Sequence, residues 1–176
     1  LNPSYQRDAV WPDPNSQALV DSILRGIPLP SIILNQREGS SVWEIVDGKQ
    51  RLTAILRFIG RHPTGVAFAR SLDPEGGEEA IRGPNYKAWA KTHGIKPADA
   101  RAHFLPFPLA KKNKKGRDSN DPLLPLAGKY YGQIVDEKVR ISGDVITIKS
   151  LFEGSGGEYA VPLILYKKTS INQIQR

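Results

Sequence analysis

The residues of this chain that are best suited to chemistry lie together at Asp47-Gly48-Lys49-Gln50-Arg51. The carboxylate of Asp47 can hold a divalent metal ion or orient a water molecule, and Gln50 can position that water. Arg51 can neutralise phosphate charge through two parallel hydrogen bonds. Phosphoryl transfer requires a metal ligand, a group that orients water and a cation that neutralises phosphate charge. The segment therefore indicates a phosphate site. An ordinary turn with a helix-capping Asp47 and solvated Lys49 and Arg51 explains the same residues.

The segment lies where a predicted strand is followed by a predicted helix. Residues 41–46 are rich in β-branched and aromatic side chains, which favours a strand. Apolar residues then recur at helical spacing at Leu52, Ile55, Leu56 and Ile59. This spacing predicts a helix over residues 49–59. Such a helix begins with unpaired N–H groups and the positive end of its dipole, and Gly48 lets a ligand approach the backbone closely, so the junction favours phosphate.

A helix and a strand are predicted upstream of this junction. We expect Asn15-Ser16 to cap a helix, because the apolar residues that follow have helical spacing. Gly26 ends this helix, and the prolines after it prevent its return. Residues 31–35 then form a strand, which pairs with residues 42–46 as an antiparallel hairpin.

Strand character returns near the end of the chain. Residues 138–141 and 145–148 flank a Ser-Gly-Asp turn and predict a second hairpin. Residues 159–166 are apolar enough for a central strand, although Pro162 favours the start of a strand or an irregular edge. We therefore expect strands and helices in one α/β (α+β) fold.

The region of residues 61–128 is looser, because it holds much of the proline and glycine. Only residues 86–93 and 97–103 have a helical pattern in it. The length of 176 residues favours one domain over residues 1–176, with 61–128 as an insertion or irregular region. An N-capped amphipathic pattern begins at Thr169, just before the chain ends, and predicts that the domain is truncated at its C-terminus.

Composition and charge limit the possible partners. The formal net charge of +7 and the pI of about 9.7 suit a polyanion such as DNA, RNA or a nucleotide. The absence of cysteine excludes disulfides and thiolate metal sites and agrees with a reducing cytoplasm. The sequence has no apolar run long enough for a membrane span and no signal-peptide pattern. We expect a cytoplasmic protein with no membrane partner.

A separate basic run is a candidate for DNA contact. Five positive charges occur within seven residues, at Lys111, Lys112, Lys114, Lys115 and Arg117. These side chains could bind backbone phosphates, which would make affinity dependent on salt and independent of base sequence. A solvated loop is the other explanation for such a run.

Familiar catalytic templates do not occur in the sequence. His62, His93 and His103 lack the spacing of metal ligands, and surface roles explain them better. The chain also has neither a Walker phosphate loop nor a Gly-x-Ser-x-Gly nucleophile elbow. The segment at residues 47–51 is what remains for catalysis.

Residues 5–59 resemble the N-terminal domain of the GmrSD-type restriction and phage-defence proteins, a family in the ParB/sulfiredoxin superfamily. The DGQQR motif of that family corresponds to residues 47–51, with Lys49 in place of the first glutamine. A Tyr-Gln-Arg element, an aromatic residue and a Leu-Val-Asp-Ser-Ile-Leu-Arg-Gly-Ile-Pro-Leu-Pro segment occur in the family's order, at residues 5–7, Trp11 and residues 19–30. Residues 159–174 resemble a later strand and helix of the family.

The resemblance implies a ParB/sulfiredoxin-like mixed sheet with flanking helices and an irregular insertion. It also implies that the motif serves nucleotide binding and hydrolysis, often coupled to DNA sensing or cleavage. Carried over by position, the catalytic residues are Asp47, Gln50 and Arg51, with Asp47 also the metal ligand, and the nucleotide-binding residues are Gln6, Arg7, Gly48 and Lys49. Without the resemblance, Gln6 and Arg7 would be ordinary surface or packing residues. Lys49 could alter nucleotide choice or metal dependence.

Two functions from different classes follow from these observations. The first is a metal-dependent NTPase, using Mg²⁺ or Mn²⁺ and GTP or ATP, that gates DNA cleavage in a restriction or antiphage system. Its partners would be DNA and a downstream nuclease domain or partner subunit. The alternative is a non-hydrolytic, ParB-like module that binds a nucleotide or DNA and acts as a sensor. Loss of turnover with retained binding in an Asp47→Ala variant would separate the enzyme from the sensor.

Overall fold

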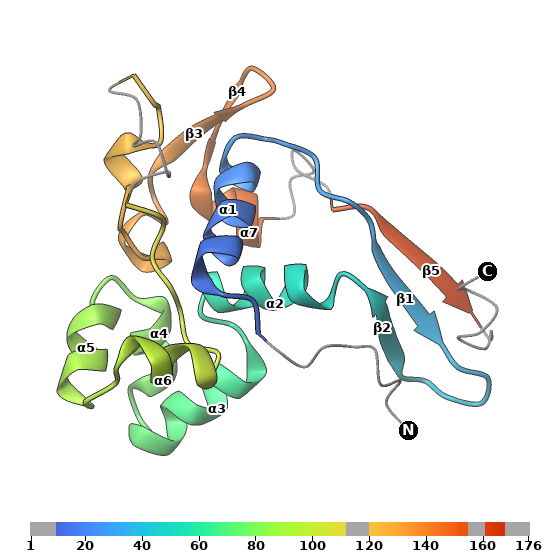
Figure 1. Cartoon of the computed structure of the whole chain (residues 1–176), viewed down its shortest axis with the longest axis horizontal. Helices are drawn as coiled ribbons and strands as arrows, with labels where there is room; N and C mark the ends of the chain where they lie inside the picture. Colours follow the sequence, from blue (N-terminus) through green and yellow to red (C-terminus); the bar gives the residue numbers. More distant parts are fainter. Residues whose placement is uncertain (1–9, 112–119, 155–160, 168–176) are drawn as a thin grey trace.

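The computed structural model describes residues 10–111, 120–154 and 161–167. Its strands and helices form an α+β fold, in which a small sheet extends away from a larger helical part (Figure 1). The sheet contains β1 (Ile32–Gln36), β2 (Trp43–Asp47) and β5 (Leu163–Lys167) in the order β2-β1-β5. β1 pairs antiparallel with β2 and parallel with β5, so the sheet is mixed. The predicted α+β class and the first hairpin are confirmed.

The remaining elements form the wider part of the molecule, where a second, two-stranded sheet lies at one end beside α1 and α7 and most of the helices lie toward the other. The helices are α1 (Asp13–Leu24), α2 (Lys49–Phe58), α3 (Pro63–Leu72), α4 (Gly77–Arg82), α5 (Tyr86–Thr92), α6 (Pro97–Ala102) and α7 (Ile148–Glu153). The second sheet is the antiparallel pair β3 (Lys138–Ile141) and β4 (Asp144–Thr147), and short 3₁₀ helices occur at Leu124–Leu126 and Tyr131–Gln133. The second predicted hairpin is therefore also confirmed.

Helix α1 begins earlier than the sequence predicted. Pro12 occupies the N-cap position and a proline stands in the first turn, while Ser16 is buried inside the helix. The prediction that Asn15-Ser16 caps this helix is wrong, because proline is already suited to the first turn and the helix starts there. Gly26 ends it as expected, with a φ of +70° that favours glycine.

Strand β5 is an edge strand and not a central one. It pairs only with β1 in this sheet, and its residues are exposed, Leu163 to 57% and Leu165 to 51%. Pro162 precedes the strand and its carbonyl oxygen accepts a hydrogen bond of 2.9 Å from Ile32 N. The apolar sequence of this segment suggested burial, but within the described residues no second layer covers it.

The region predicted to be loose contains more helix than expected. Helices α5 and α6 confirm the two predicted patches, whereas α3 and α4 were missed. The glycines that argued against helices permit close packing here. A Cβ added to Gly65 would lie 2.6 Å from the carbonyl oxygen of Phe104, and one added to Gly77 would lie 2.3 Å from that of Ala69. Glycine at these positions therefore lets backbones meet and does not break the fold.

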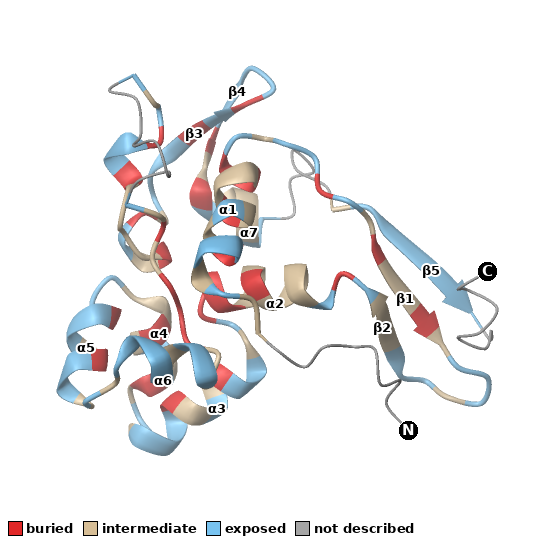
Figure 2. Ribbon diagram, viewed as in Figure 1, coloured by how far each residue is buried: buried red, intermediate tan, exposed pale blue. Residues whose placement is uncertain are grey.

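The main core lies where α1, α2 and the second sheet meet (Figure 2). Its centre is Phe58, which is 0% exposed and whose ring lies 5.8 Å from Phe107, 5.6 Å from Tyr131 and 5.5 Å from Phe152. A second buried cluster joins α3, α4 and α5. The main core holds the C-terminal end of α2 in place through Leu56 and Phe58. Among the helices that the structure describes, none has the length and apolarity to cross a membrane.

Candidate functional site

The junction between β2 and α2 has the geometry that the sequence predicted. β2 ends at Asp47, Gly48 is buried with a φ of +91°, and α2 begins at Lys49. Gly48 is the N-cap residue, and no side chain caps this end of the helix. The first-turn N–H groups and the positive end of the helix dipole are therefore not neutralised by a side-chain cap, which suits an anion.

Asp47 and Arg51 form an ion pair across the first turn of α2. Arg51 Nη2 donates to Asp47 Oδ2 at 2.9 Å and to the carbonyl oxygen of Ser31 at 2.9 Å. The Arg51 side chain is 16% exposed, whereas that of Asp47 is 62% exposed. The sequence left open that Asp47 merely caps the helix, but Gly48 holds the cap position. The junction thus offers a fixed guanidinium beside an exposed carboxylate.

Gln50 connects the motif to the segment that leads into α1. Its Oε1 accepts a hydrogen bond of 3.1 Å from the backbone N–H of Trp11. Trp11 itself is half-buried. Lys49 is exposed at the first position of α2. The structure thus brings together residues 47–51, while their chemical roles stay predictions.

Gly48 is required at this junction by both conformation and space. A Cβ at this position would lie 2.9 Å from Ile32 Cγ1, 3.1 Å from Arg51 Nη2 and 3.3 Å from Ile32 Cα. The first distance is shorter than a normal contact, and the positive φ disfavours any residue with a Cβ. A side chain here would disturb both the sheet and the arginine.

We expect Gly48→Ala to lower the free energy of unfolding by about 1–2 kcal/mol from the left-handed backbone alone, with a further cost from the contact with Ile32. Urea unfolding of both proteins measures this change. As a control, Gly39→Ala also has a positive φ but meets nothing within 4 Å. The control should show only the backbone cost, and equal losses in the two variants would contradict the role of close packing.

A metal ion at this site would depend on the substrate for most of its ligands. Among the residues that the structure places, no group of three or more His, Cys, Asp or Glu side chains could hold a metal. Within the described part of the chain, Asp47 supplies its carboxylate outside any such group. This donor set fits Mg²⁺, which is commonly held by one or two carboxylates together with substrate phosphates and water, and it does not fit an ion held by protein ligands alone.

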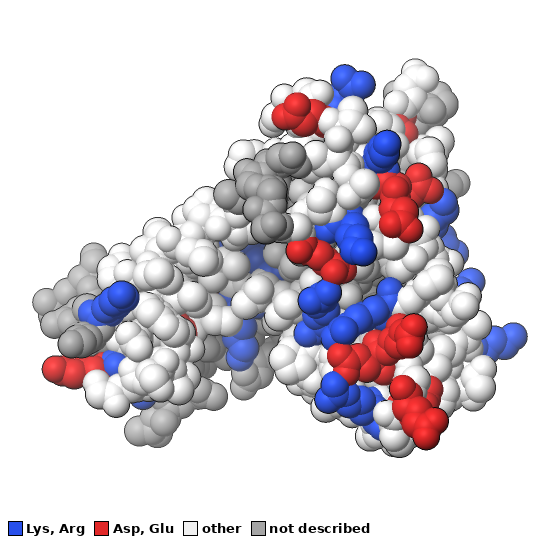
Figure 3. Space-filling model, turned by 180° about the vertical axis from the view of Figure 1, so that it is seen from behind, with Lys and Arg blue, Asp and Glu red and all other residues white. Residues whose placement is uncertain are grey.

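Several predicted site residues lie outside the described residues. These are Gln6, Arg7, Lys112, Lys114, Lys115 and Arg117. Lys111 is described and is exposed. On the face in Figure 3, acidic and basic side chains lie next to one another over the wider part of the molecule, and the end that carries β1, β2 and β5 is mostly uncharged. DNA contact by the basic run therefore stays a prediction.

The histidines pack against aromatic rings. His62 stacks on Phe104 with ring centroids 4.3 Å apart, and His103 stacks on Phe68 at 3.8 Å. His62 is half-buried, and its Nδ1 is buried without a hydrogen-bond partner. Burial lowers the pKa of His62, and the nearby charge of Arg57 lowers it further. The fold therefore favours the neutral imidazole.

This lowered pKa gives a pH dependence with a definite sign. Because the folded pKa of His62 lies below the ordinary value of 6.5, the unfolded chain binds the proton more readily. The stabilisation is fully present above that ordinary value and is lost as the pH falls through the folded pKa. We expect the melting temperature to fall on acidification below about pH 6.5, and less steeply in His62→Phe, which keeps the stacked ring. Identical pH profiles for the two proteins would contradict this.

Arg57 is a buried residue that the sequence did not single out. Its side chain is 1% exposed, with Nε donating to the carbonyl oxygen of Leu105 at 3.2 Å and Nη2 to Asp13 Oδ1 at 3.3 Å. The guanidinium lies 5.1 Å from the centroid of the Phe107 ring. Arg57 lies outside the apolar stripe of Leu52, Ile55, Leu56 and Ile59, so the helical spacing gave no signal for its burial.

One family model matches the chain over almost its whole length. It is described as the N-terminal domain of the GmrSD restriction endonuclease, and it matches residues 1–173. Neither the comparison with curated proteins nor that with solved structures gave a match. The matched range includes the junction at residues 47–51 and the whole described structure.

Proposed function

We propose, on the premise that the chain belongs to the family of GmrSD restriction endonuclease N-terminal domains, that residues 47–51 bind nucleotide phosphates and that the domain hydrolyses GTP or ATP. Family membership makes the chain part of a restriction, or antiphage defence, protein. A restriction protein acts on DNA, so DNA is the expected partner. Nucleotide hydrolysis would then gate the attack on DNA.

The observation that best supports this proposal is the uncapped start of α2 next to a fixed Arg51. The positive end of the α2 dipole attracts phosphate oxygens, and Gly48 leaves no side chain in the way. Arg51 is held by Asp47 and by the carbonyl oxygen of Ser31, so little side-chain entropy remains to be lost when it binds phosphate. The arrangement is preorganised for an anion.

The exposed carboxylate of Asp47 has a separate role in this proposal. It would contribute one oxygen to a Mg²⁺ ion that arrives with the nucleotide, and such an ion neutralises charge that develops on the phosphates. The same carboxylate can orient an attacking water through a hydrogen bond, because it is 62% exposed. Arg51 remains close enough to stabilise the negative charge of the transition state.

The non-hydrolytic sensor remains the second candidate because of the contact that Gln50 makes. Its carbonyl oxygen already accepts the N–H of Trp11 at 3.1 Å, which gives this side chain a structural task. A Gln50 that stays bound to the backbone has one of the two acceptor positions of that oxygen occupied and its orientation fixed, which hinders it from turning toward an attacking water. Binding without turnover would follow if the contact persists in the nucleotide complex.

Phosphate release by purified full-length protein tests the proposal. The four ribonucleotides are offered singly, with and without Mg²⁺ and with and without DNA. We expect Mg²⁺-dependent release from GTP or ATP. No release from any nucleotide under any of these conditions, together with measurable nucleotide binding, would establish the sensor in place of the enzyme.

A further inference from the structure

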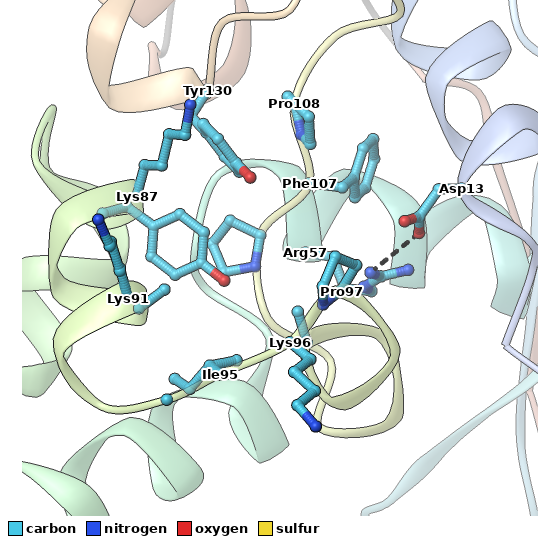
Figure 4. Close-up of a pocket in the computed structure, with 15 residues that line it drawn as sticks. Asp13, Arg57, Lys87, Lys91, Ile95, Lys96, Pro97, Phe107, Pro108 and Tyr130 are labelled. Carbon is cyan, nitrogen blue, oxygen red and sulfur yellow. Dashed lines mark hydrogen bonds and ion pairs between the residues drawn. The ribbon is translucent and has the colours of Figure 1, made fainter.

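A second candidate site lies between α1, α2, α5 and α6, away from the start of α2. It is a cavity of about 460 Å³, which is within the range of small-molecule sites. Figure 4 shows Arg57 and Asp13 at one end of this pocket, Lys87 and Lys91 at the other, and Tyr130 between them. The site residues proposed above do not line it.

Arg57 gives this pocket its most specific chemical feature. The side chain is 1% exposed, and its Nη1 is buried without any hydrogen-bond partner. The two other nitrogens bind Leu105 and Asp13, so Nη1 with its two N–H groups is left over. Burial lowers the pKa of Arg57 from its ordinary value, yet a guanidinium stays charged in proteins. An unsatisfied charged donor is costly, and an anion in the pocket would satisfy it.

The charge of the pocket lining favours an anion as well. Its cationic residues are Arg57, Lys87, Lys91 and Lys96, and Asp13 is its acidic residue. The three lysines are exposed at the rim, where they can attract a ligand and contact its charged group. Asp13 is engaged by Arg57 and therefore repels an anion less than a free carboxylate would.

The walls between these charges are largely apolar. They are formed by Ala90, Ile95, Pro97, Ala100, Pro106, Phe107 and Pro108. A simple inorganic ion would leave these surfaces in contact with water. A ligand with both a phosphate and a planar or apolar body uses the basic groups and the walls together.

We propose that this pocket binds a nucleoside monophosphate unit, with its phosphate directed to Arg57 and the rim lysines and its base against the proline and alanine walls. This is a second site, distinct from the nucleotide-hydrolysis site proposed for residues 47–51. The unit has two possible sources, a free mononucleotide or one nucleotide of a DNA strand. The volume of about 460 Å³ and the buried arginine favour one nucleotide and not a duplex.

Isothermal titration calorimetry with AMP and GMP on the intact protein tests this site. The titrations are done in EDTA, which removes the Mg²⁺-dependent part of any binding at the start of α2, and an Arg51→Met variant identifies the metal-independent part. We expect AMP, GMP or both to bind. Adenosine, guanosine and inorganic phosphate should bind at least about tenfold more weakly, because each offers either the base or the phosphate but not both. A single-stranded DNA tetranucleotide serves as competitor and distinguishes the two sources.

The decisive variant is Lys87→Ala combined with Lys91→Ala. Both residues are exposed on α5, so the fold should be kept, and we expect roughly tenfold weaker binding of the monophosphate. Lys149→Ala removes an exposed lysine of α7 that is not in the pocket and serves as the matched control. Arg57→Met, with folding checked by circular dichroism, should abolish binding.

Two results would overturn the pocket assignment. One is that neither AMP nor GMP binds in EDTA. The other is that binding is lost in Arg51→Met, with folding checked by circular dichroism, but unchanged in the double lysine variant, which would move the ligand to the start of α2. Failure of nucleotide hydrolysis leaves this test intact, because the titration measures binding of a product-like ligand without metal. If the tetranucleotide displaces the bound monophosphate, the natural ligand is a nucleotide of a DNA strand. If it does not, the natural ligand is a free mononucleotide.

Discussion

Replacing Asp47 by alanine should lower Mg²⁺-dependent nucleotide hydrolysis at least about 100-fold, which corresponds to roughly 2.7 kcal/mol of transition-state stabilisation. The variant removes the carboxylate that would share the metal ion and orient water. It leaves Arg51 bound to the carbonyl oxygen of Ser31 at 2.9 Å. Nucleotide affinity measured without metal should therefore change by less than about threefold.

The fold should tolerate this substitution. The Asp47 side chain is 62% exposed, and exposed ion pairs contribute little to stability. Equal melting temperatures of the variant and the natural protein would verify that lost turnover is a chemical effect. Steady-state phosphate release and nucleotide titration of the same preparations supply the two measurements.

Glu38→Ala is the matched control for this prediction. Glu38 is an exposed carboxylate in the turn that joins β1 and β2, so it alters charge in the same hairpin without touching the motif. Its turnover should equal that of the natural protein. The enzyme proposal fails if Asp47→Ala retains full turnover, and the sensor is favoured if neither protein has any.

Phe58→Ala should have the largest effect on stability, lowering the free energy of unfolding by about 3–5 kcal/mol. Phe58 is 0% exposed, and its ring contacts three other aromatic rings from different parts of the chain. Its removal leaves a cavity that these rings cannot fill without shifting. Each aromatic pair adds about 0.5–1.5 kcal/mol beyond the buried area, so the loss should lie toward the upper end.

Chemical unfolding in urea, followed by fluorescence and circular dichroism, measures this change. Phe58→Leu is the control, since it keeps most of the apolar volume and loses only the ring contacts. We expect it to cost less than half as much as alanine. If leucine and alanine were equally destabilising, the aromatic contacts and not the filled volume would dominate the core.

Local features of the fold were predictable from the sequence because they depend on neighbouring residues. The hairpin before the motif, the start of α2 and the left-handed Gly26 follow from side-chain spacing and from glycine. Placing Gly48 at the junction was possible for the same reason. The resemblance to a restriction family was needed to propose a nucleotide, since the residues alone fitted a turn equally well.

Features that depend on distant contacts were missed or misjudged. Gly65 and Gly77 looked like helix breakers until the structure showed which backbones they approach. Strand β5 has a core-like sequence but lies at the edge of its sheet. The pairing of Arg57 with Asp13 joins residues 44 positions apart, and no local pattern reports such a contact.

The short segment from Trp11 to Asp13 touches α2 twice, at Gln50 and at Arg57. These two residues are seven apart and thus lie on the same side of the helix, about 10 Å from each other. A ligand that withdraws Gln50 from Trp11 loosens the segment that also positions Asp13 against Arg57. By thermodynamic linkage, any factor by which such a ligand changes the affinity of the neighbouring pocket is the factor by which a pocket ligand changes the affinity of the first site. The segment from Trp11 to Asp13 thus links Gln50, near the start of α2, to Arg57, near its end.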